Sequence, residues 1–389
     1  MQNFRFLSPT EIIFGKDTQS VVGTETKKYS DKVLLHYGSG HIKKSGLYDQ
    51  VIASLREADV EVVELGGVQP NARLKLVREG VDICKKEGIT FILAVGGGSV
   101  IDSAKAIAVG AMSDKDVWDF YTWEADVEAA LPIGAVLTIP AAGSEASPGS
   151  VVTDWPNNNK RHIDSDLVRP KFAVMNPELT YTLPPYQTAC GAADIMAHIM
   201  ERYFTSTTDV DFTDRLCEAT MKTIIGNVAI ALESPDDYAS RAEIMWASTI
   251  AHNDLLSTGR EGDWASHMLE HEVSGINDVA HGAGLAVIFP ALLKFLYKRD
   301  LQRYVQFAVR VWNVEQDFDN PEKTALEGIA RLEAFFTAIG LPTRLSQIDL
   351  PEEKFARIAE NVRKFDDVTV GNVAKLSPSE VIEVLTIAK

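Results

Sequence analysis

The stretch of sequence that decides the fold is FILAVGGGSVIDSAKAIAV, residues 91–109. Its first five residues are apolar, as in a buried parallel strand, three glycines follow, and residues 100–109 show helical spacing. A strand, a glycine turn and a helix start place free backbone N–H groups and positive helix-dipole charge at one point. The sequence therefore favours a phosphate-binding loop. The alternative is a tight turn in which Ser99 caps the helix and Asp102 completes a capping box.

Similar alternations of strand and helix flank this stretch. We predict further strands at 33–35, 60–65, 133–139 and 172–175, and helices at 48–58 and 74–87. Strands that alternate with helices of this length indicate a parallel sheet with helices on both faces. The segment 4–14 is a candidate edge hairpin that turns at Ser8, Pro9 and Thr10.

The pattern changes after Leu183, Pro184 and Pro185, and the rest of the chain predicts helices without strands. The helices are expected at 187–204, 209–232, 235–258 and 283–297, with Asp209 and Ser234 as N-caps. We therefore predict an α/β nucleotide-type domain at 1–185 and an all-helical domain at 186–389.

Composition excludes several functional classes. The 389 residues include 38 basic and 55 acidic side chains, which gives a formal charge of −17. Such acidity disfavours binding to nucleic acid or to an anionic membrane. Three widely separated cysteines indicate reduced thiols in a cytoplasmic protein rather than a disulfide framework. The start shows no apolar signal-peptide core, and no apolar stretch is long enough to span a membrane.

The end of the second predicted strand bears on cofactor choice. Its sequence is Gly38-Ser39-Gly40-His41-Ile42-Lys43-Lys44. An acidic residue at this place in a dinucleotide fold binds the ribose 2′-hydroxyl and repels a 2′-phosphate. The segment has no carboxylate but offers a hydroxyl, an imidazole and two ammonium groups. If a dinucleotide binds, NADP(H) is therefore favoured over NAD(H); the alternative is a solvated loop with surface lysines.

Histidines concentrate in the helical half. Asp194 and His198 are four residues apart, His267 and His271 repeat that spacing, and His281 follows. A spacing of four places two side chains on one helix face. One carboxylate and three imidazoles suit Zn²⁺ or Fe²⁺ better than Mg²⁺ or Ca²⁺. The alternative is a set of histidines that serve only the core or the surface.

Together these motifs make the chain resemble the iron-containing (group III) alcohol dehydrogenases. They follow one another in the family's order: Gly96-Gly97-Gly98-Ser99-x-x-Asp102, Pro140-Ala141-Ala142-Gly143-Ser144-Glu145, Asp194-x₃-His198, His267-x₃-His271 and His281-Gly282-Ala283-Gly284. The similarity is greatest to the NADPH-dependent butanol dehydrogenase branch, through Gly15-Lys16, Lys43-Lys44-Ser45-Gly46 and the stretch from Asn176 to Gln187. Two positions depart from the family's usual pattern, Ala142 in place of Thr and Ser147 in place of Asn.

The resemblance implies a Rossmann-like N-terminal dinucleotide-binding domain, an all-helical C-terminal metal-binding domain and an active-site cleft between them. It implies one divalent ion, iron or zinc, held by Asp194, His198, His267 and His281. It also implies that His271 assists substrate binding or proton transfer, and we include Asp102 with it among the catalytic residues. The implied cofactor-binding residues are Gly38, Ser39, Gly40, Lys43, Asn71, Gly97, Gly98, Ser99, Asp102, Thr138, Ser144 and Lys160.

The implied activity is reversible hydride transfer between NADP(H) and a primary alcohol or aldehyde of the butanol or butanal type. We expect a homodimer without nucleic-acid or membrane partners. One alternative keeps the fold, as in glycerol-type polyol dehydrogenases or dehydroquinate synthase-like enzymes. A second is a metal-dependent hydrolase with Glu270 or Glu272 as base, and a third is a binding protein without catalysis.

Overall fold

The computed structural model describes residues 1–362 and 369–389, and their packing forms two units. The sheet unit comprises Leu7–Leu183 and Ser234–Asn253. The helical unit comprises Met1–Phe6, Pro184–Glu233 and the described part of Asp254–Lys389. The boundary of folding domains at residue 185 stays a prediction, because the packing assigns two short segments to the unit on the other side of it.

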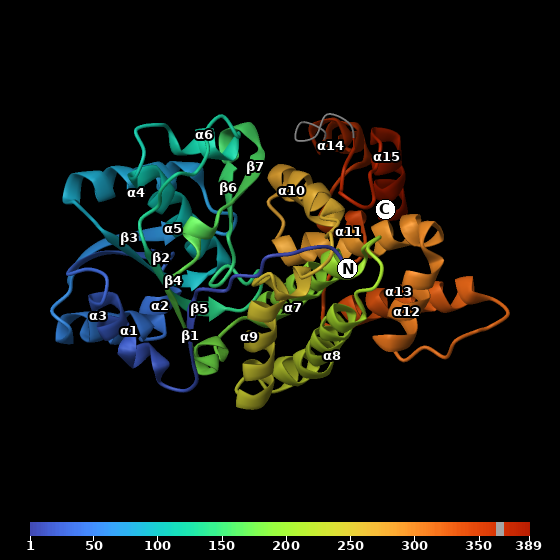
Figure 1. Ribbon diagram of the computed structural model, residues 1–389, viewed down its shortest axis with the longest axis horizontal. Helices are drawn as coiled ribbons and strands as arrows, with labels where there is room; N and C mark the ends of the chain where they lie inside the picture. Colours follow the sequence, from blue (N-terminus) through green and yellow to red (C-terminus); the bar gives the residue numbers. More distant parts are fainter. Residues whose placement is uncertain (363–368) are drawn as a thin grey trace. The chain divides into compact units, whose positions relative to one another are not determined.

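The sheet unit is built on a six-stranded sheet of order β1-β8-β5-β4-β2-β3 (Figure 1). Every neighbouring pair of strands in it is parallel, which confirms the predicted α/β class. The strands are β1 (Glu11–Phe14), β2 (Lys32–Gly38), β3 (Glu61–Val68), β4 (Phe91–Gly97), β5 (Ile133–Ile139) and β8 (Phe172–Met175).

Alternate residues of the central strands enter separate cores on the two faces of the sheet. Leu34 of β2 packs in a core with α4 (Leu74–Glu87) and α5 (Gly98–Ala111). Its neighbours Val33 and Leu35 pack in another core, with α1 (Val22–Lys27) and α3 (Leu47–Glu57). Figure 1 shows α4 and α5 on one side of the sheet and α1 and α3 on the other. Burial on both faces explains why these strands are continuous apolar runs.

Two details of the sheet unit differ from the sequence-based expectation. The predicted edge hairpin at 4–14 is wrong, because only β1 forms there and it pairs in parallel with β8. An unpredicted antiparallel hairpin joins β6 (Gly149–Asp154) to β7 (Asn159–Asp164). Polar and charged residues interrupt these two short strands, so their periodicity was too weak to reveal them.

The helical unit contains no strand among its described residues, only an isolated bridge between Val370 and Leu376. Its helices are α7 (Pro185–Tyr203), α8 (Asp211–Glu233), α10 (Ala265–Asn277), α11 (His281–Leu296), α12 (Leu301–Arg310), α13 (Pro321–Ala338), α14 (Phe355–Asn361) and α15 (Pro378–Ile387). The helix α7 packs most extensively against α8 and α11, and α10 packs against α11. None of the described helices combines the length and the apolar character that crossing a bilayer requires.

The helix α9 (Tyr238–His252) belongs to the sheet unit. The predicted N-cap Ser234 is wrong: Asp237 caps α9 by accepting a hydrogen bond from the Ser240 N–H at 2.7 Å. The Ser234 carbonyl instead accepts a hydrogen bond from the Asp237 N–H at 3.0 Å, which closes a turn ahead of the helix. The proline at position 235 therefore lies in this turn and not in the first turn of α9.

Candidate metal centre and cofactor loops

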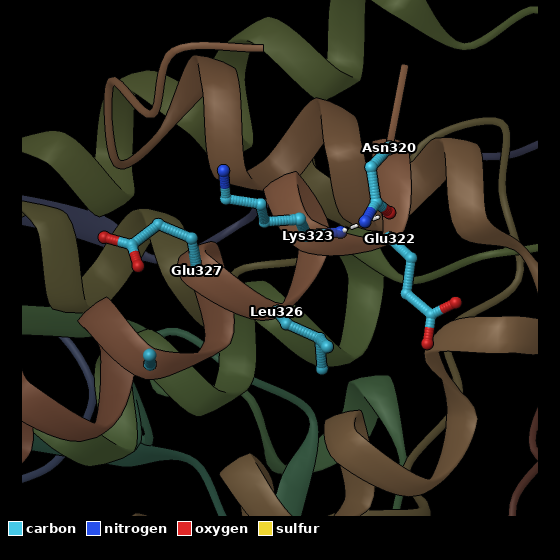
Figure 2. A pocket seen from close by; sticks show the side chains of 6 residues that line it. Asn320, Glu322, Lys323, Leu326 and Glu327 are labelled. Atoms are coloured by element: carbon cyan, nitrogen blue, oxygen red, sulfur yellow. Dashed lines mark hydrogen bonds between the residues drawn. The ribbon is translucent and has the colours of Figure 1, made fainter. Parts of the chain in front are cut away.

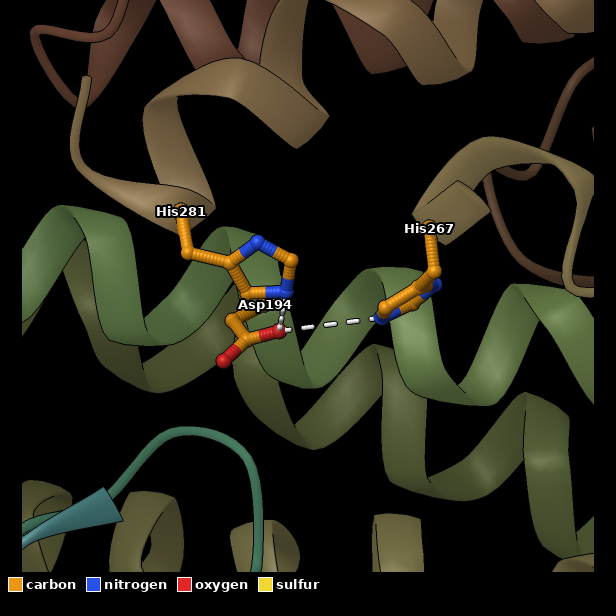
Figure 3. A group of neighbouring side chains, drawn as sticks. All are labelled: Asp194, His267 and His281. Carbon is orange, nitrogen blue, oxygen red and sulfur yellow. Dashed lines mark ion pairs between the residues drawn. The ribbon is translucent and has the colours of Figure 1, made fainter. Parts of the chain in front are cut away.

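Three helices of the helical unit bring four predicted ligands together. The helix α7 carries Asp194 and His198 one turn apart, α10 carries His267, and α11 begins at His281. The Nε2 atoms of the three histidines lie 3.4, 3.9 and 3.6 Å from the same carboxylate oxygen, Oδ1 of Asp194. Figure 3 shows the Asp194 carboxylate between the rings of His267 and His281.

This arrangement fits a divalent cation. Atoms that bind one ion at ~2.1 Å with tetrahedral angles lie ~3.4 Å apart, close to the 3.4 to 3.9 Å between the imidazole Nε2 atoms and Oδ1 of Asp194. Ligand atoms of Asp194, His267 and His281 all lie within 4.8 Å of one another. Distances of 3.6 and 3.9 Å are long for direct hydrogen bonds. Among the described residues, the buried Nε2 of His267 makes no hydrogen bond. An ion would bind this nitrogen and balance the charge of the buried Asp194 carboxylate.

Two further carboxylates orient the imidazoles. Glu201, only 1% exposed, accepts hydrogen bonds from Nδ1 of His267 at 2.9 Å and from its backbone N–H at 3.2 Å. Glu270 is fully buried and accepts a hydrogen bond from Nδ1 of His281. A proton fixed on Nδ1 leaves the lone pair on Nε2, which is the nitrogen directed at Asp194.

The sequence reasoning missed the role of Glu201, although a signal was present. Asp194, His198 and Glu201 are spaced by four and three residues, so they share one face of α7. Glu270 stands three residues after His267 on α10. The hydrolase alternative gives it the role of a base, whereas its carboxylate accepts a hydrogen bond from His281.

His271 lies beside this group. It is half-buried, and its ring centroid is 5.5 Å from that of His281. Ligand-type atoms of Glu270, His271 and His281 lie within 4.8 Å of one another, whereas the group around Asp194 contains His267 and His281. His281 thus belongs to both groups, His271 only to the one with Glu270, and His198 to neither, although its Nε2 lies 3.4 Å from Oδ1 of Asp194.

The glycine loop lies in the sheet unit, where β4 ends at Gly97 and α5 begins at Gly98. The N-cap is Gly97 and no side chain caps the helix, so the alternative with Ser99 as the cap is wrong. A Cβ on Gly97 would lie 3.0 Å from the Ile139 Cβ, and a Cβ on Gly98 would lie 3.8 Å from that of Ala142. The loop thus packs against the end of β5, which carries the predicted Thr138, and the residues that follow it.

Asp102 joins α5 to the segment after β5. Its Oδ1 accepts a hydrogen bond from the Ser144 hydroxyl at 2.6 Å, and its Oδ2 accepts one from the Val151 N–H at 3.2 Å. Burial raises the pKa of Asp102, and the charges of Lys105 and Lys160 oppose this rise. Both carboxylate oxygens of Asp102 thus accept hydrogen bonds, one of them from Ser144, and the charge of Lys160 acts on the same carboxylate.

The segment that contains Asn71 is linked by a backbone hydrogen bond to the β6–β7 hairpin, which carries Lys160. Asn71 is half-buried and has a left-handed φ of 56°. The carbonyl of the next residue, Ala72, accepts a hydrogen bond from the Thr153 N–H at 2.7 Å. Thr153 pairs with Lys160 in the β6–β7 hairpin. The two predicted cofactor-binding residues Asn71 and Lys160 therefore lie on segments that a backbone hydrogen bond joins.

The candidate 2′-phosphate loop follows β2. Gly40 has a φ of 117° and precedes the short helix α2 (His41–Lys44), while Ser39 is exposed. A Cβ on Gly38 would lie 3.9 Å from a methyl carbon of Val100, near the start of α5. The Lys43 ammonium lies 3.8 Å from the Glu64 carboxylate of β3. A carboxylate thus approaches this loop from another strand, which the sequence of 38–44 alone did not indicate.

A separate surface pocket lies on α13 (Figure 2). It is lined by Asn320, Glu322, Lys323, Leu326, Glu327 and Ala330. The Asn320 side chain accepts a hydrogen bond from the Lys323 N–H at 3.3 Å and so caps this helix. None of the predicted site residues lines this pocket.

The chain is similar to known proteins over nearly its whole length. Residues 9–177 match the family described as iron-containing alcohol dehydrogenase, and residues 188–388 match the C-terminal region of that family. A probable NADH-dependent butanol dehydrogenase of Bacillus subtilis is 43% identical over 99% of both chains. The NADPH-dependent aldehyde reductase of Escherichia coli is 39% identical over 90% of both. The crystal structure of an NADH-dependent butanol dehydrogenase from Thermotoga maritima superposes with a TM-score of 0.96, at 38% identity, over 100% of this chain and 99% of the other.

Proposed function

The chain belongs to the iron-containing alcohol dehydrogenase family, and we propose that it interconverts short primary alcohols and aldehydes with NADP(H). Butanol and butanal are the proposed substrate type. The observation that carries the proposal is the convergence of three imidazole Nε2 atoms within 3.9 Å of one Asp194 oxygen. Family membership argues against the hydrolase alternative, and the engagement of Glu270 with His281 agrees with that.

The metal-binding residues are proposed to be Asp194, His198, His267 and His281. A divalent cation held by them would supply Lewis acidity to stabilise negative charge on the substrate oxygen. One carboxylate and three imidazoles suit iron or zinc. Glu201 prepares this site by holding the proton of His267 on Nδ1, so that Nε2 is available as a donor.

His271 is proposed to exchange a proton with the alcohol oxygen, directly or through water. An imidazole suits this role because it titrates near neutral pH. His271 lies beside the predicted ligand His281 but belongs to a different group of neighbouring ligand atoms from Asp194 and His267, which agrees with a role in proton transfer next to the ion.

The cofactor is a nicotinamide nucleotide, which supplies or accepts the hydride. Gly97, Gly98 and Ser99 are proposed to bind its pyrophosphate through the backbone N–H groups at the start of α5. Thr138, Ser144 and Lys160 are proposed to contact its nicotinamide half, and Asn71 is proposed as a further cofactor-binding residue. Asp102 is proposed to support this half through its hydrogen bond with Ser144.

The proposed preference for NADP(H) rests on Ser39, His41 and Lys43 at the end of β2. Glu64 opposes it in part, because its carboxylate shares the Lys43 ammonium. Glu64 also accepts hydrogen bonds from the Tyr37 and Tyr48 hydroxyls at 2.9 and 2.6 Å. The named relatives include both NADH-dependent and NADPH-dependent enzymes. The ratio of NADPH to NADH oxidation with butanal measures this preference, and faster NADH oxidation would refute it.

The experiment that tests the activity combines metal analysis with turnover. Purified protein should hold about one divalent ion per chain and oxidise NADPH when butanal is added. His267→Ala should lose both the ion and the turnover. The matched control is His162→Ala, which removes an imidazole from β7 in the other unit and should retain the ion. Turnover by metal-free His267→Ala would refute the proposal, and glycerol in the same panel tests the polyol alternative.

We further propose a homodimer in the cytoplasm. The cytoplasmic location rests on the three free cysteines, Cys84, Cys190 and Cys217. Light scattering on the eluted protein measures the oligomeric state directly, and a monomer mass would refute the dimer.

A further inference from the structure

A buried ammonium group lies in the middle of the helix that starts at the glycine loop. Lys105 of α5 is 0% exposed. Its Nζ donates hydrogen bonds to the backbone carbonyls of Ser147 at 2.9 Å and Gly149 at 2.7 Å. The Ser147 hydroxyl lies 3.4 Å from the same nitrogen. None of the roles assigned to the cofactor site uses this lysine.

Burial of an ammonium is costly unless hydrogen bonds and opposite charges compensate for it. Burial lowers the pKa of Lys105 to about 8, while the carboxylates of Asp102, Glu145 and Asp164 oppose this and Arg169 adds to it. An apolar side chain would fill this helix position without such a cost. The specific contacts of Lys105 therefore point to a role beyond packing.

The hydrogen bonds of Lys105 all go to the segment 140–149, which runs from the end of β5 to the first residue of β6. Arg169, which is 4% exposed, donates a hydrogen bond to the Ala146 carbonyl of the same segment at 2.7 Å. Asp102 binds the Ser144 hydroxyl one turn before Lys105 on α5. Two buried cations and one carboxylate thus hold this segment, and two of these three groups come from α5.

We propose that Lys105 is a positioning residue that fixes segment 140–149 against the first turns of α5. Ala142 then stays beside Gly98, where an added Cβ would lie 3.8 Å from the Ala142 Cβ, and Ser144 stays hydrogen-bonded to Asp102. The segment is held in its binding conformation before the cofactor arrives, so binding does not require its ordering. This inference rests on the proposed function of Gly97–Ser99 and Ser144 as cofactor-binding residues.

The test is the affinity for NADPH, measured by fluorescence titration on metal-free protein and therefore without turnover. Lys105→Met keeps the length of the side chain but removes its donors, and we expect the Kd for NADPH to rise about tenfold. The control Lys86→Met removes an exposed lysine of α4 and should leave the Kd unchanged. An unchanged Kd in folded Lys105→Met would overturn the inference alone. Absence of NADPH and NADH binding by wild-type protein would instead refute the proposed function.

A second measurement covers the case in which Lys105→Met does not fold. Hydrogen exchange of wild-type protein without cofactor should show slow exchange of the amides in 144–149, because the segment is already fixed. Rapid exchange there, followed by protection when NADPH is added, would show that the cofactor orders the segment and would overturn the inference.

Discussion

Replacement of Glu201 by glutamine tests how far the metal centre depends on residues that do not touch the ion. Oε1 of Glu201 accepts hydrogen bonds from Nδ1 of His267 at 2.9 Å and from the Ser266 hydroxyl at 2.5 Å. Oε2 accepts one from the Trp264 N–H at 2.7 Å. Glutamine keeps the shape and one acceptor oxygen, but its NH₂ group would then meet the Trp264 N–H. Glu201→Gln thus removes a buried negative charge and one hydrogen bond.

The expected loss is in metal affinity. Removal of a hydrogen-bonding partner of a metal-bound histidine costs about 10–100-fold in affinity, or about 1.4–2.7 kcal/mol. We expect Glu201→Gln to lie in this range, because His267 keeps a neutral acceptor but loses the carboxylate that makes its ring more basic.

The assay is competition for Zn²⁺ between the protein and a chromophoric chelator. The matched control is Glu218→Gln, since Glu218 is another buried carboxylate of the helical unit and accepts a hydrogen bond from the Tyr203 hydroxyl at 3.0 Å. Both variants lose a buried charge, but only Glu201→Gln should bind zinc more weakly. Equal zinc affinities of Glu201→Gln, Glu218→Gln and wild-type protein would show that Glu201 does not strengthen metal binding.

Three further predictions concern other parts of the chain. His271→Ala should retain about one ion per chain but lower kcat about 10²–10⁴-fold, as expected for loss of a proton-transfer group; loss of the ion would make His271 a ligand. Lys43→Ala should lower kcat/KM for NADPH about tenfold and spare NADH, whereas an equal effect on both would contradict a 2′-phosphate contact. Burial of His36, whose ring binds the Leu65 carbonyl and the Ser103 hydroxyl at 2.8 Å each, lowers its pKa to about 4. The unfolded chain therefore binds a proton at this imidazole more readily than the folded chain. The contribution of neutral, buried His36 to the free energy of unfolding is lost as pH falls from about 6.5 towards 4. Denaturant titrations should show a loss of about 2 kcal/mol between pH 7 and pH 5 that His36→Asn does not show.

Strong apolar periodicity made much of the fold predictable. The bounds of α4, β5 and β8 agree with the predicted ranges because apolar runs and turn residues define both ends. The β6–β7 hairpin escaped because neither strand carries an apolar run. The predicted cap at Ser234 is wrong because Ser234 and Asp237, three positions apart, are both residue types that cap helices. Asp237 caps α9, whereas Ser234 closes the turn before it.

The candidate site divides in the same way. The spacing of four residues predicted that Asp194 and His198 lie on one face of a helix. The structure places His267 and His281 beside that face. The hydrogen bond between Glu201 and His267 joins residues 66 positions apart, so only the tertiary structure reveals it. The ion pair between Lys43 and Glu64 of β3 also joins residues that are distant in the sequence, so it too is visible only in the tertiary structure. Local periodicity therefore identified the ligand types, and long-range packing determined what orients them.

The most direct test of the metal centre is anomalous diffraction from crystals of metal-loaded protein, recorded on both sides of the absorption edge of the bound metal. We predict one strong peak per chain, ~2.1 Å from Oδ1 of Asp194 and from the Nε2 atoms of His198, His267 and His281. A peak bound by other residues, or an active crystal with no peak among these four side chains, would contradict this prediction.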